Sequence, residues 1–181
     1  MTAQIGERLH YDGENYSMAA QPFDVYLKKY NIRTASDCTA NWRGYYGAWE
    51  IKDDKLFLVS ISANILKEDR KQGFLHRSED YSTVGLDYFF PGQKEVFAEW
   101  FSGEVRIPCG EMLHYVHMGY SSIFEQDLFL EFKEGVLINE RLVDNRKQSD
   151  QAEDENNKQH KPVTKKGWVN AFLRIFEDKN D

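Results

Sequence analysis

The stretch from Trp42 to Ile61, which reads WRGYYGAWEIKDDKLFLVSI, constrains the fold more than any other part of the sequence. Apolar and charged side chains alternate over residues 49–52, which is the two-residue period of a strand with one buried face. Asp53 and Asp54 then provide a turn, and residues 56–61 form a second apolar run. We therefore expect a hairpin. Because both faces of its second strand are apolar, that strand should lie inside the sheet with a partner on each side.

Aromatic side chains are concentrated in the first half of this stretch, around Gly44 and Gly47. Glycine within a strand pattern indicates a bulge or a close backbone approach. Two interpretations remain open: the aromatic side chains belong to the core, or they bind a sugar, a planar ligand or another protein. The candidate ligand-binding residues in this cluster are Trp42, Arg43, Tyr45, Tyr46 and Trp49. The outward half of the cluster, Arg43, Tyr45 and Tyr46, stays a functional candidate only if those side chains are exposed.

Turn chemistry predicts two further hairpins. Asp12-Gly13 lies within an alternating segment, and Glu134-Gly135 separates two alternating runs between residues 127 and 143. Between the first hairpin and the central one, apolar side chains recur at positions i, i+3, i+4 and i+7 after Pro22. This spacing predicts a short amphipathic helix that lies on the sheet and ends near Asn31.

The middle of the chain is less regular. Residues 67–87 are predicted to form a long excursion, which is either a lid or partner-binding loop or a loop with an edge strand near residues 73–77. Residues 93–101 place apolar side chains on one side, as in a second short helix. Residues 103–118 read as another hairpin that turns at residues 108–110, Pro-Cys-Gly.

A change in composition divides the chain near its C-terminal end. Residues 1–143 are expected to form one β-rich globular domain. Residues 144–161 contain a single Ala and no larger apolar side chain, so residues 144–166 are predicted to be a disordered polar linker. Residues 167–178 then place apolar side chains on one face, which predicts an amphipathic helix. The candidate partner-binding residues of this helix are Trp168, Val169, Phe172, Leu173 and Phe176.

Three roles are open for this C-terminal helix. It can dock back onto the sheet and cover its own apolar face. It can bind a groove on a partner, because a long linker is well suited to presenting a ligand. It can also lie on a membrane, although Glu177, Asp178 and Asp181 would repel anionic lipid. Membrane association is the least favoured of the three.

The charge of the chain bears on its partners. The sequence has 23 Lys and Arg against 30 Asp and Glu, a net charge of −7. This balance argues against a nucleic-acid binder, because affinity for a phosphate backbone comes mainly from Lys and Arg. Residues 144–181 carry equal numbers of acidic and basic side chains, so the net charge belongs to the β domain. We expect this domain to attract a basic protein partner.

Targeting signals are not apparent in the sequence. It has no apolar run near the roughly 20 residues that a membrane helix needs, and its first ten residues lack the pattern of a signal peptide. We therefore expect a cytoplasmic protein. Cys38 and Cys109 are outside any zinc-ligand or CxxC spacing and are expected to be reduced thiols.

The usual signatures of catalysis are missing from the sequence, which contains no GxSxG, GxGxxG, P-loop, HExxH or EF-hand motif. His114 and His117 are further ligand-binding candidates. Residues three apart on a strand point to opposite faces, so this pair is not expected to share a metal. One of them is expected to be a hydrogen-bonded core residue. No catalytic residue, metal or cofactor is predicted.

These observations predict an α+β domain dominated by antiparallel hairpins, which form a strongly curved sheet or a partly closed barrel with short helices. The C-terminal amphipathic helix is an appendage to it. For function, the sequence favours a non-catalytic protein-interaction module that acts through its acidic surface and its tethered helix. The alternative is a small-molecule-binding domain or a modest enzyme, with a pocket between the sheet and the loop at residues 67–87.

Overall fold

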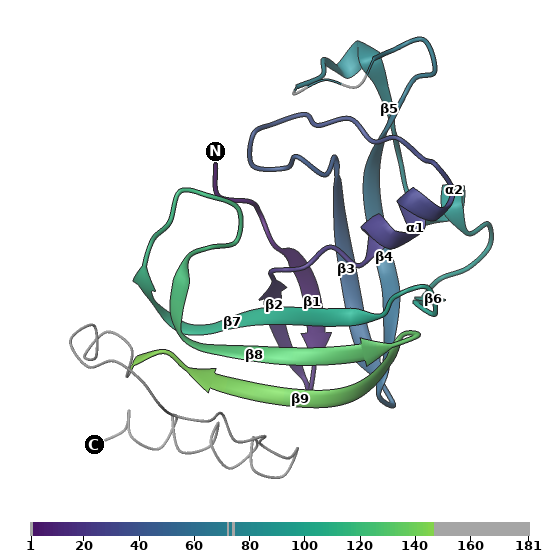
Figure 1. Cartoon of the computed structure of the whole chain (residues 1–181). Helices are drawn as coiled ribbons and strands as arrows, with labels where there is room; N and C mark the ends of the chain where they lie inside the picture. Colours follow the sequence, from purple (N-terminus) through teal and green to yellow (C-terminus); the bar gives the residue numbers. More distant parts are fainter. Residues whose placement is uncertain (1, 72, 74, 147–181) are drawn as a thin grey trace.

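A computed structural model of the chain describes residues 2–71, 73 and 75–146 (Figure 1). This part is mostly β and contains one mixed sheet of nine strands in the order β2-β1-β3-β4-β9-β8-β7, with β5 and β6 attached to β4. The strands and helices are β1 Glu7–Tyr11, β2 Glu14–Met18, α1 Phe23–Lys29, β3 Tyr45–Lys52, β4 Lys55–Leu66, the 3-10 turn η1 Ser78–Asp80, β5 Tyr81–Val84, α2 Leu86–Phe89, β6 Val96–Phe97, β7 Gly103–His114, β8 Ile123–Lys133 and β9 Val136–Asp144.

Three of the four predicted hairpins are present, and each of them turns through two residues with positive φ. Asp12-Gly13 joins β1 to β2, Asp53-Asp54 joins β3 to β4, and Glu134-Gly135 joins β8 to β9. Such turns match the right-handed twist of the flanking strands. Strand β4 lies inside the sheet as expected, with β3 on one side and β5, β6 and β9 on the other. The pairing of β3 with β4 also shifts register at Ala48/Trp49, so the expected irregularity is there.

One strand pair is parallel, which the sequence did not predict. Strand β1 pairs with β3 in the same direction, with Leu9 opposite Trp49. The chain reaches β3 only after β2 and α1, and this long connection brings it back in the direction of β1. Two parallel strands need such a crossover connection. The sequence patterns identify hairpins, and a hairpin joins antiparallel strands, so the parallel pair was missed.

The sheet is bent into two layers whose strands cross (Figure 1). The layers meet at a corner where Lys55 of β4 pairs with Val136 of β9. At the opposite side, the edges of the sheet approach each other, and the backbone N–H of Ala19 donates to the carbonyl of Arg106 (2.8 Å). The sheet is nevertheless not closed into a barrel, so the alternative of a partly closed barrel is corrected to an open, bent sheet.

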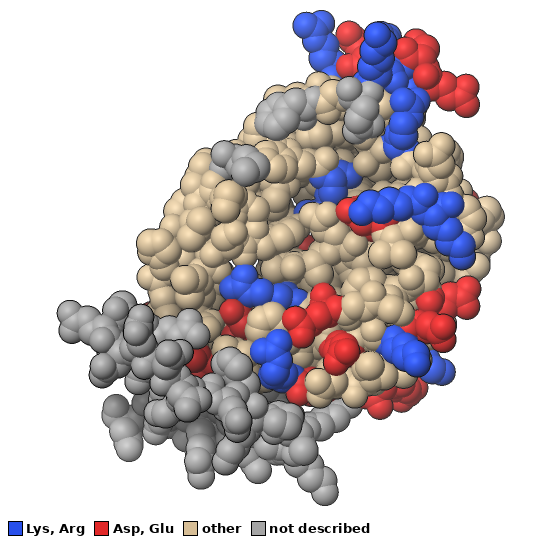
Figure 2. Space-filling model, in the orientation of Figure 1, with Lys and Arg blue, Asp and Glu red and all other residues tan. Residues whose placement is uncertain are grey.

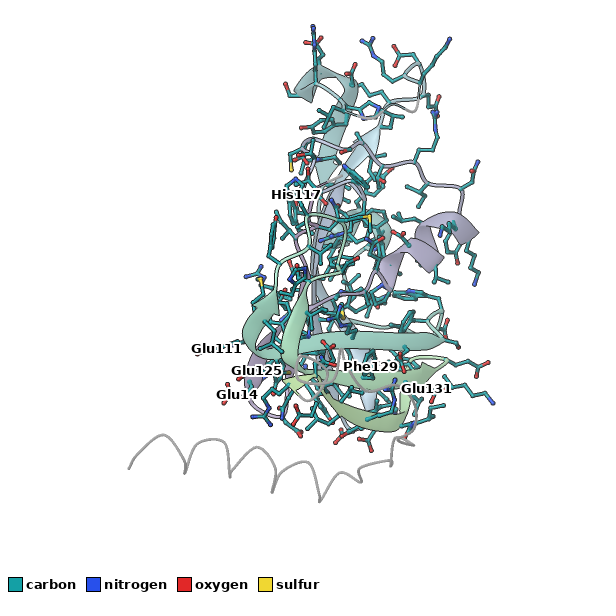
Figure 3. All side chains as sticks on the ribbon, turned by 60° about the vertical axis from the view of Figure 1, so that its left-hand side comes forward. Glu14, Glu111, His117, Glu125, Phe129 and Glu131 are labelled. Atoms are coloured by element: carbon teal, nitrogen blue, oxygen red, sulfur yellow. The ribbon has the colours of Figure 1, made fainter. Side chains whose placement is uncertain are left out.

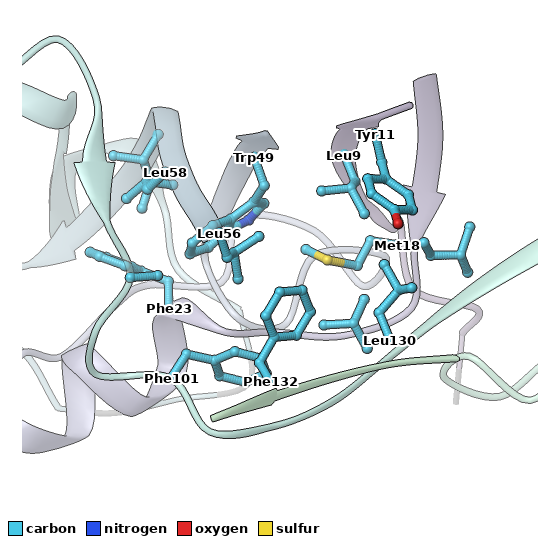
Figure 4. Packing of buried hydrophobic residues seen from close by; sticks show 14 of the residues in the cluster. Leu9, Tyr11, Met18, Phe23, Trp49, Leu56, Leu58, Phe101, Leu130 and Phe132 are labelled. Carbon is cyan, nitrogen blue, oxygen red and sulfur yellow. The ribbon is translucent and has the colours of Figure 1, made fainter. Parts of the chain in front are cut away.

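The core fills the space between the two layers (Figure 4). Inward positions alternate along each strand, as a sheet with one buried face requires. Helix α1 adds Phe23 and Leu27 to this core and packs over the sheet as predicted. The most deeply buried apolar side chains of the strands are Leu9, Tyr11, Met18, Tyr45, Trp49, Leu56, Leu58, Ala63, Val105, Ile107, Leu128, Leu130 and Phe132.

Three sequence-based predictions for the middle of the chain are wrong. Residues 103–114 form one continuous strand, β7, in place of a hairpin that turns at residues 108–110. The helix predicted at residues 93–101 is absent from this described stretch, which contains the short strand β6, and a short helix, α2, comes earlier. An edge strand was expected near residues 73–77, but the strand of this loop is β5, which begins only at Tyr81. Tertiary pairing with β4 and β8 overrides the local patterns in all three cases.

The last strand extends slightly beyond the predicted domain end. Strand β9 ends at Asp144, and Asn145 is buried, so the first residues assigned to the linker belong to the folded part. The rest of the linker, the helix expected at residues 167–178 and its candidate residues lie outside the described residues. Within the described residues, no helix has the length and apolar character that crossing a membrane requires.

Candidate functional site

The aromatic cluster of the central hairpin is mainly core. Tyr45 and Trp49 are fully buried and Arg43 is buried, whereas Trp42 is half-buried. Tyr46 is the exposed member of the outward half, with 39% of its surface accessible. The structure therefore brings these residues together as predicted, but it places most of them away from solvent.

A buried carboxylate, Glu7, lies under this cluster. Trp49 Nε1 donates to Glu7 Oε2 (2.6 Å), and Arg43 Nε lies 3.6 Å from Glu7 Oε1. Burial raises the pKa of Glu7 to about 7, against the opposing effects of the Trp49 hydrogen bond and the Arg43 charge. Glu7 was not predicted from the sequence. The alternation along β1 could have indicated its burial, because Glu7 lies two and four residues before Leu9 and Tyr11 and so shares their inward face.

The polar network around Arg43 extends to both sides of the sheet. Arg43 Nη1 donates to the carbonyl of Ile5 (2.7 Å) and to the hydroxyl of Tyr120 (2.8 Å). Tyr45 donates its hydroxyl proton to Asp24 Oδ1 (2.8 Å) on α1, and burial raises the pKa of Tyr45. Tyr45 thus connects the hairpin with α1, and Arg43 connects it with β1 and with the segment after β7. Buried and hydrogen-bonded in this way, the pair holds elements together.

Exposed apolar side chains are concentrated at the β7–β8 tip, which we define as residues 111–124. It comprises the end of β7, the connecting segment and the start of β8 (Figure 1). Five large apolar side chains of this segment are between 40% and 55% exposed. Such a concentration on one segment is typical of an interaction surface. The five residues are Met112, Leu113, Tyr115, Met118 and Ile123.

The β7–β8 tip is held in place by Arg106 and by the N-terminal segment. Arg106 donates to the carbonyls of Tyr120 (2.7 Å) and Ser122 (2.9 Å) and to Asp127 Oδ1 (2.8 Å). The backbone N–H of Gln4 donates to the carbonyl of Gly119 (2.8 Å). A guanidinium with three fixed acceptors is rigid. The exposed apolar side chains are therefore carried by an ordered support.

A pocket of about 180 Å³ opens beside the β7–β8 tip. Met112, Tyr115 and Phe124 line it from the tip, and Met18 lines it from β2. Hydroxyl groups are also available at its wall, among them that of Tyr120, which contacts Arg43. A cavity of about 150 Å³ accommodates one benzene-sized molecule. The pocket is thus large enough for a single aromatic or branched aliphatic group.

The Asp and Glu side chains between residues 107 and 132 are not matched by any Lys or Arg within that stretch. Glu111 and Glu125 are joined by a hydrogen bond from the Glu111 N–H to Glu125 Oε2 (3.0 Å), and Figure 3 shows both on the side of the molecule where Glu14 also lies. Figure 2 shows that the face over the connecting segment carries almost no charged side chain. The apolar surface therefore has an acidic margin and an uncharged centre.

The two histidines of this segment are both exposed. His114 is the last residue of β7, and His117 follows in the connecting segment, where its Nδ1 lies 2.9 Å from the Tyr115 hydroxyl. The prediction that one of them is a core residue is wrong, because the outer half of β7 extends beyond the core. Among residues 2–71, 73 and 75–146, no three His, Cys, Asp or Glu side chains are grouped to hold a metal ion.

A second hollow lies between α1 and the segment before β7. It has a volume of about 450 Å³, and both aromatic and polar side chains line it. The Phe90 and Trp100 rings are stacked, with their centroids 5.7 Å apart. The ring centroid of Tyr26 lies 5.1 Å from that of Trp100 and 4.6 Å from that of the exposed Tyr30. The polar residues of this wall are Lys29, Gln93 and Glu99.

The predicted pocket at the loop of residues 67–87 is not among these hollows. The described residues of that loop contribute nothing to the walls of the two hollows above, nor to a shallow one beside β7 and β9. Fold and site together define a mostly β protein with an apolar tip, an acidic margin and a small pocket. No protein-family model, curated protein or solved structure matches the chain. The function is therefore argued from the residues themselves.

Proposed function

We propose that this protein is a non-catalytic protein-interaction module that binds a basic protein partner at the β7–β8 tip. One observation carries the proposal: five large apolar side chains are 40% to 55% exposed on a single segment beside an apolar-walled pocket. Methionine and tyrosine, which supply three of the five, are enriched at protein interfaces. The partner inserts one aromatic or aliphatic side chain into the pocket, and the surrounding contacts exclude water.

The charge of the surface defines the rest of the partner. Glu111 and Glu125 lie at the margin of the β7–β8 tip, and residues 107–132 contain no Lys or Arg. Charges at the rim of an interface increase the rate of encounter and select against partners of like charge. A segment with Lys or Arg close to its apolar anchor matches this arrangement. The acidic net charge of the domain acts in the same direction.

A cytoplasmic location belongs to the same proposal. The two cysteines of the chain, Cys38 and Cys109, are both within the described residues and are free thiols. This is in keeping with a reducing compartment. The tethered C-terminal helix of the sequence-based hypothesis also remains part of the proposal, although it lies outside the described residues.

A peptide-display selection against the full chain tests this function. We expect enriched peptides to share an aromatic or aliphatic anchor with Lys or Arg nearby, and to lose binding to the variant Tyr115→Asp. Ile138→Asp is the matched control, because Ile138 is equally exposed at 55% but lies on β9. Enriched peptides that bind both variants equally would contradict the proposal, since their site would lie elsewhere.

A small-molecule binder is the second candidate function, and the hollow beside α1 favours it. Tyr26, Tyr30 and Trp100 line it with aromatic rings, and Lys29 and Glu99 provide hydrogen-bonding groups. Ring faces combined with a few polar side chains suit a sugar or another planar ligand. The hollow is about 450 Å³, within the range of small-molecule sites.

A thermal-shift screen of sugars and planar metabolites separates this candidate from the first. A ligand bound at the hollow raises the melting temperature of the full chain. Tyr30→Ala removes that rise, because Tyr30 lines the hollow. The variant should still fold, since Tyr30 is exposed and is not part of the core. Met112→Asp serves as the control and leaves the rise unchanged. A ligand whose effect survives Tyr30→Ala would contradict the assignment to this hollow.

A further inference from the structure

We infer that the pocket at the β7–β8 tip binds the chain's own C-terminal segment, with Trp168 as the side chain that enters it. This inference rests on the proposed function, because it uses the same pocket. It adds a specific ligand: the segment Lys165–Phe176, which competes with the basic partner.

The point at which the chain leaves the described part lies against the wall of the pocket. Asn145 Nδ2 donates to the carbonyl of Phe124 (3.0 Å), and the Asn145 backbone N–H donates to the carbonyl of Glu125 (2.8 Å). Phe124 itself lines the pocket. Asn145 Nδ2 also donates to Asp127 Oδ2 (2.9 Å), the same carboxylate that holds Arg106. The remaining chain thus starts at the site it would fill.

The length of the connection fits this assignment. Residues 147–166 provide 20 residues between Arg146 and the start of the apolar segment. A flexible polar chain of that length would have a root-mean-square span of about 25 Å, and it starts beside Phe124, which lines the pocket. Tethering at this length gives an effective concentration in the range of about 1 mM. Even a weak contact is then populated within one molecule.

The chemistry of the segment matches that of the tip. Lys165 and Lys166 precede Trp168 with only Gly167 between them, and the tip offers the carboxylates of Glu111 and Glu125. An indole ring is of the size that the pocket of about 180 Å³ accommodates. The segment is therefore a basic sequence with an aromatic anchor, which is the partner chemistry that the tip requires.

Methyl NMR of the full chain tests the inference directly. The sequence has four methionines, of which Met18 and Met112 line the pocket and Met118 is exposed on the tip. With ¹³C-methyl labels, Trp168→Ala is expected to shift the Met18 and Met112 signals, because the ring current of the indole is lost. The matched control Asn170→Ala changes a polar side chain of the same segment and leaves both signals in place.

The outcomes separate the inference from the function on which it rests. Unchanged Met18 and Met112 signals in Trp168→Ala would overturn the inference. If they are unchanged while displayed peptides still bind in a Tyr115-dependent way, the proposed function stands alone. If they shift but no such peptide is enriched, the tip binds only its own segment and the proposed partner falls. A shift that disappears on dilution would show binding between two copies and would also overturn the inference.

Discussion

Asn145 donates a hydrogen bond from its side-chain amide to the backbone carbonyl of Phe124, at 3.0 Å. Asn145 is the second-last described residue of the chain, and Phe124 lines the pocket of the β7–β8 tip. The same amide also bonds Asp127, which in turn accepts from Arg106. The orientation of the tip and the exit of the chain are therefore fixed by one network.

Arg106 is expected to be the most costly residue of that network to lose. Arg106→Met removes three hydrogen bonds and leaves the Asp127 carboxylate, which is nearly buried, without its cation. We expect a loss of about 2 to 4 kcal/mol in the free energy of unfolding, measured by urea denaturation. The control is Arg70→Met, whose ion pair with Asp80 is solvent-exposed and should cost less than about 1 kcal/mol. Equal losses in the two variants would refute the role given to Arg106.

Glu7 should make the fold less stable as the pH rises. Its pKa is about 7 in the folded chain, against 4.5 as the ordinary value. The folded state therefore holds this proton more tightly, so its contribution is complete below pH 4.5 and is lost as the pH rises through 7. We expect this loss to reach about 3 kcal/mol. Denaturation at pH 5 and pH 8 measures it.

Glu7→Gln is the matching variant for that measurement. The amide oxygen can still accept from Trp49 Nε1, but the side chain no longer titrates. The difference in unfolding free energy between pH 5 and pH 8 should shrink markedly in this variant. If the variant loses as much stability as the parent chain over this range, another group is responsible.

Gly47 should not tolerate a side chain. A Cβ at this position would meet the Glu7 carboxylate and would lie 2.8 Å from Trp49 Nε1. Gly47→Ala should therefore lower the unfolding free energy by about 1 to 3 kcal/mol, because the buried pair has to move. Gly85→Ala is the control, since the closest atom there is 3.7 Å away, an ordinary contact. Thermal melts of the two variants compare them.

Glu111 is expected to contribute to the rate at which a partner binds. Glu111→Gln removes one of the two acidic side chains beside the apolar surface while keeping the backbone N–H that bonds Glu125. A displayed basic peptide should associate several-fold more slowly at low salt, and the difference should vanish at high salt. Surface plasmon resonance at two salt concentrations gives both rates. An association rate at low salt that is the same in Glu111→Gln and the parent chain would contradict an electrostatic role.

The sequence predicted the local features of this fold well. Each two-residue turn, at Asp12-Gly13, Asp53-Asp54 and Glu134-Gly135, was identified because turn chemistry depends on the residues themselves. Pro108 misled the prediction of a turn in β7. In the structure Pro108 lies within β7, opposite Asp127 of β8. Strand β7 is at the edge of the sheet, where the missing backbone N–H of a proline costs little.

The candidate site was harder to predict, for a physical reason. Leu113 and Ile123 have the same strand-like pattern as core residues, and they are exposed because they lie at the ends of β7 and β8 that extend beyond the core. Glu7 is the opposite case: a charged residue normally faces solvent, but this one is buried. Its burial depends on Trp49 and Arg43, which are distant in sequence. Alternation identifies the faces of a strand, but it does not show which part of the strand is covered.

Isothermal titration of an enriched basic peptide into the full chain tests the central claim most directly. We predict saturable binding to the parent chain and to Ile138→Asp, and a loss of about tenfold or more in affinity for Met112→Asp, because Met112 lines the pocket and is half exposed. Circular dichroism confirms that each variant is folded. Undiminished binding by a folded Met112→Asp variant would contradict the claim that the β7–β8 tip is the binding site.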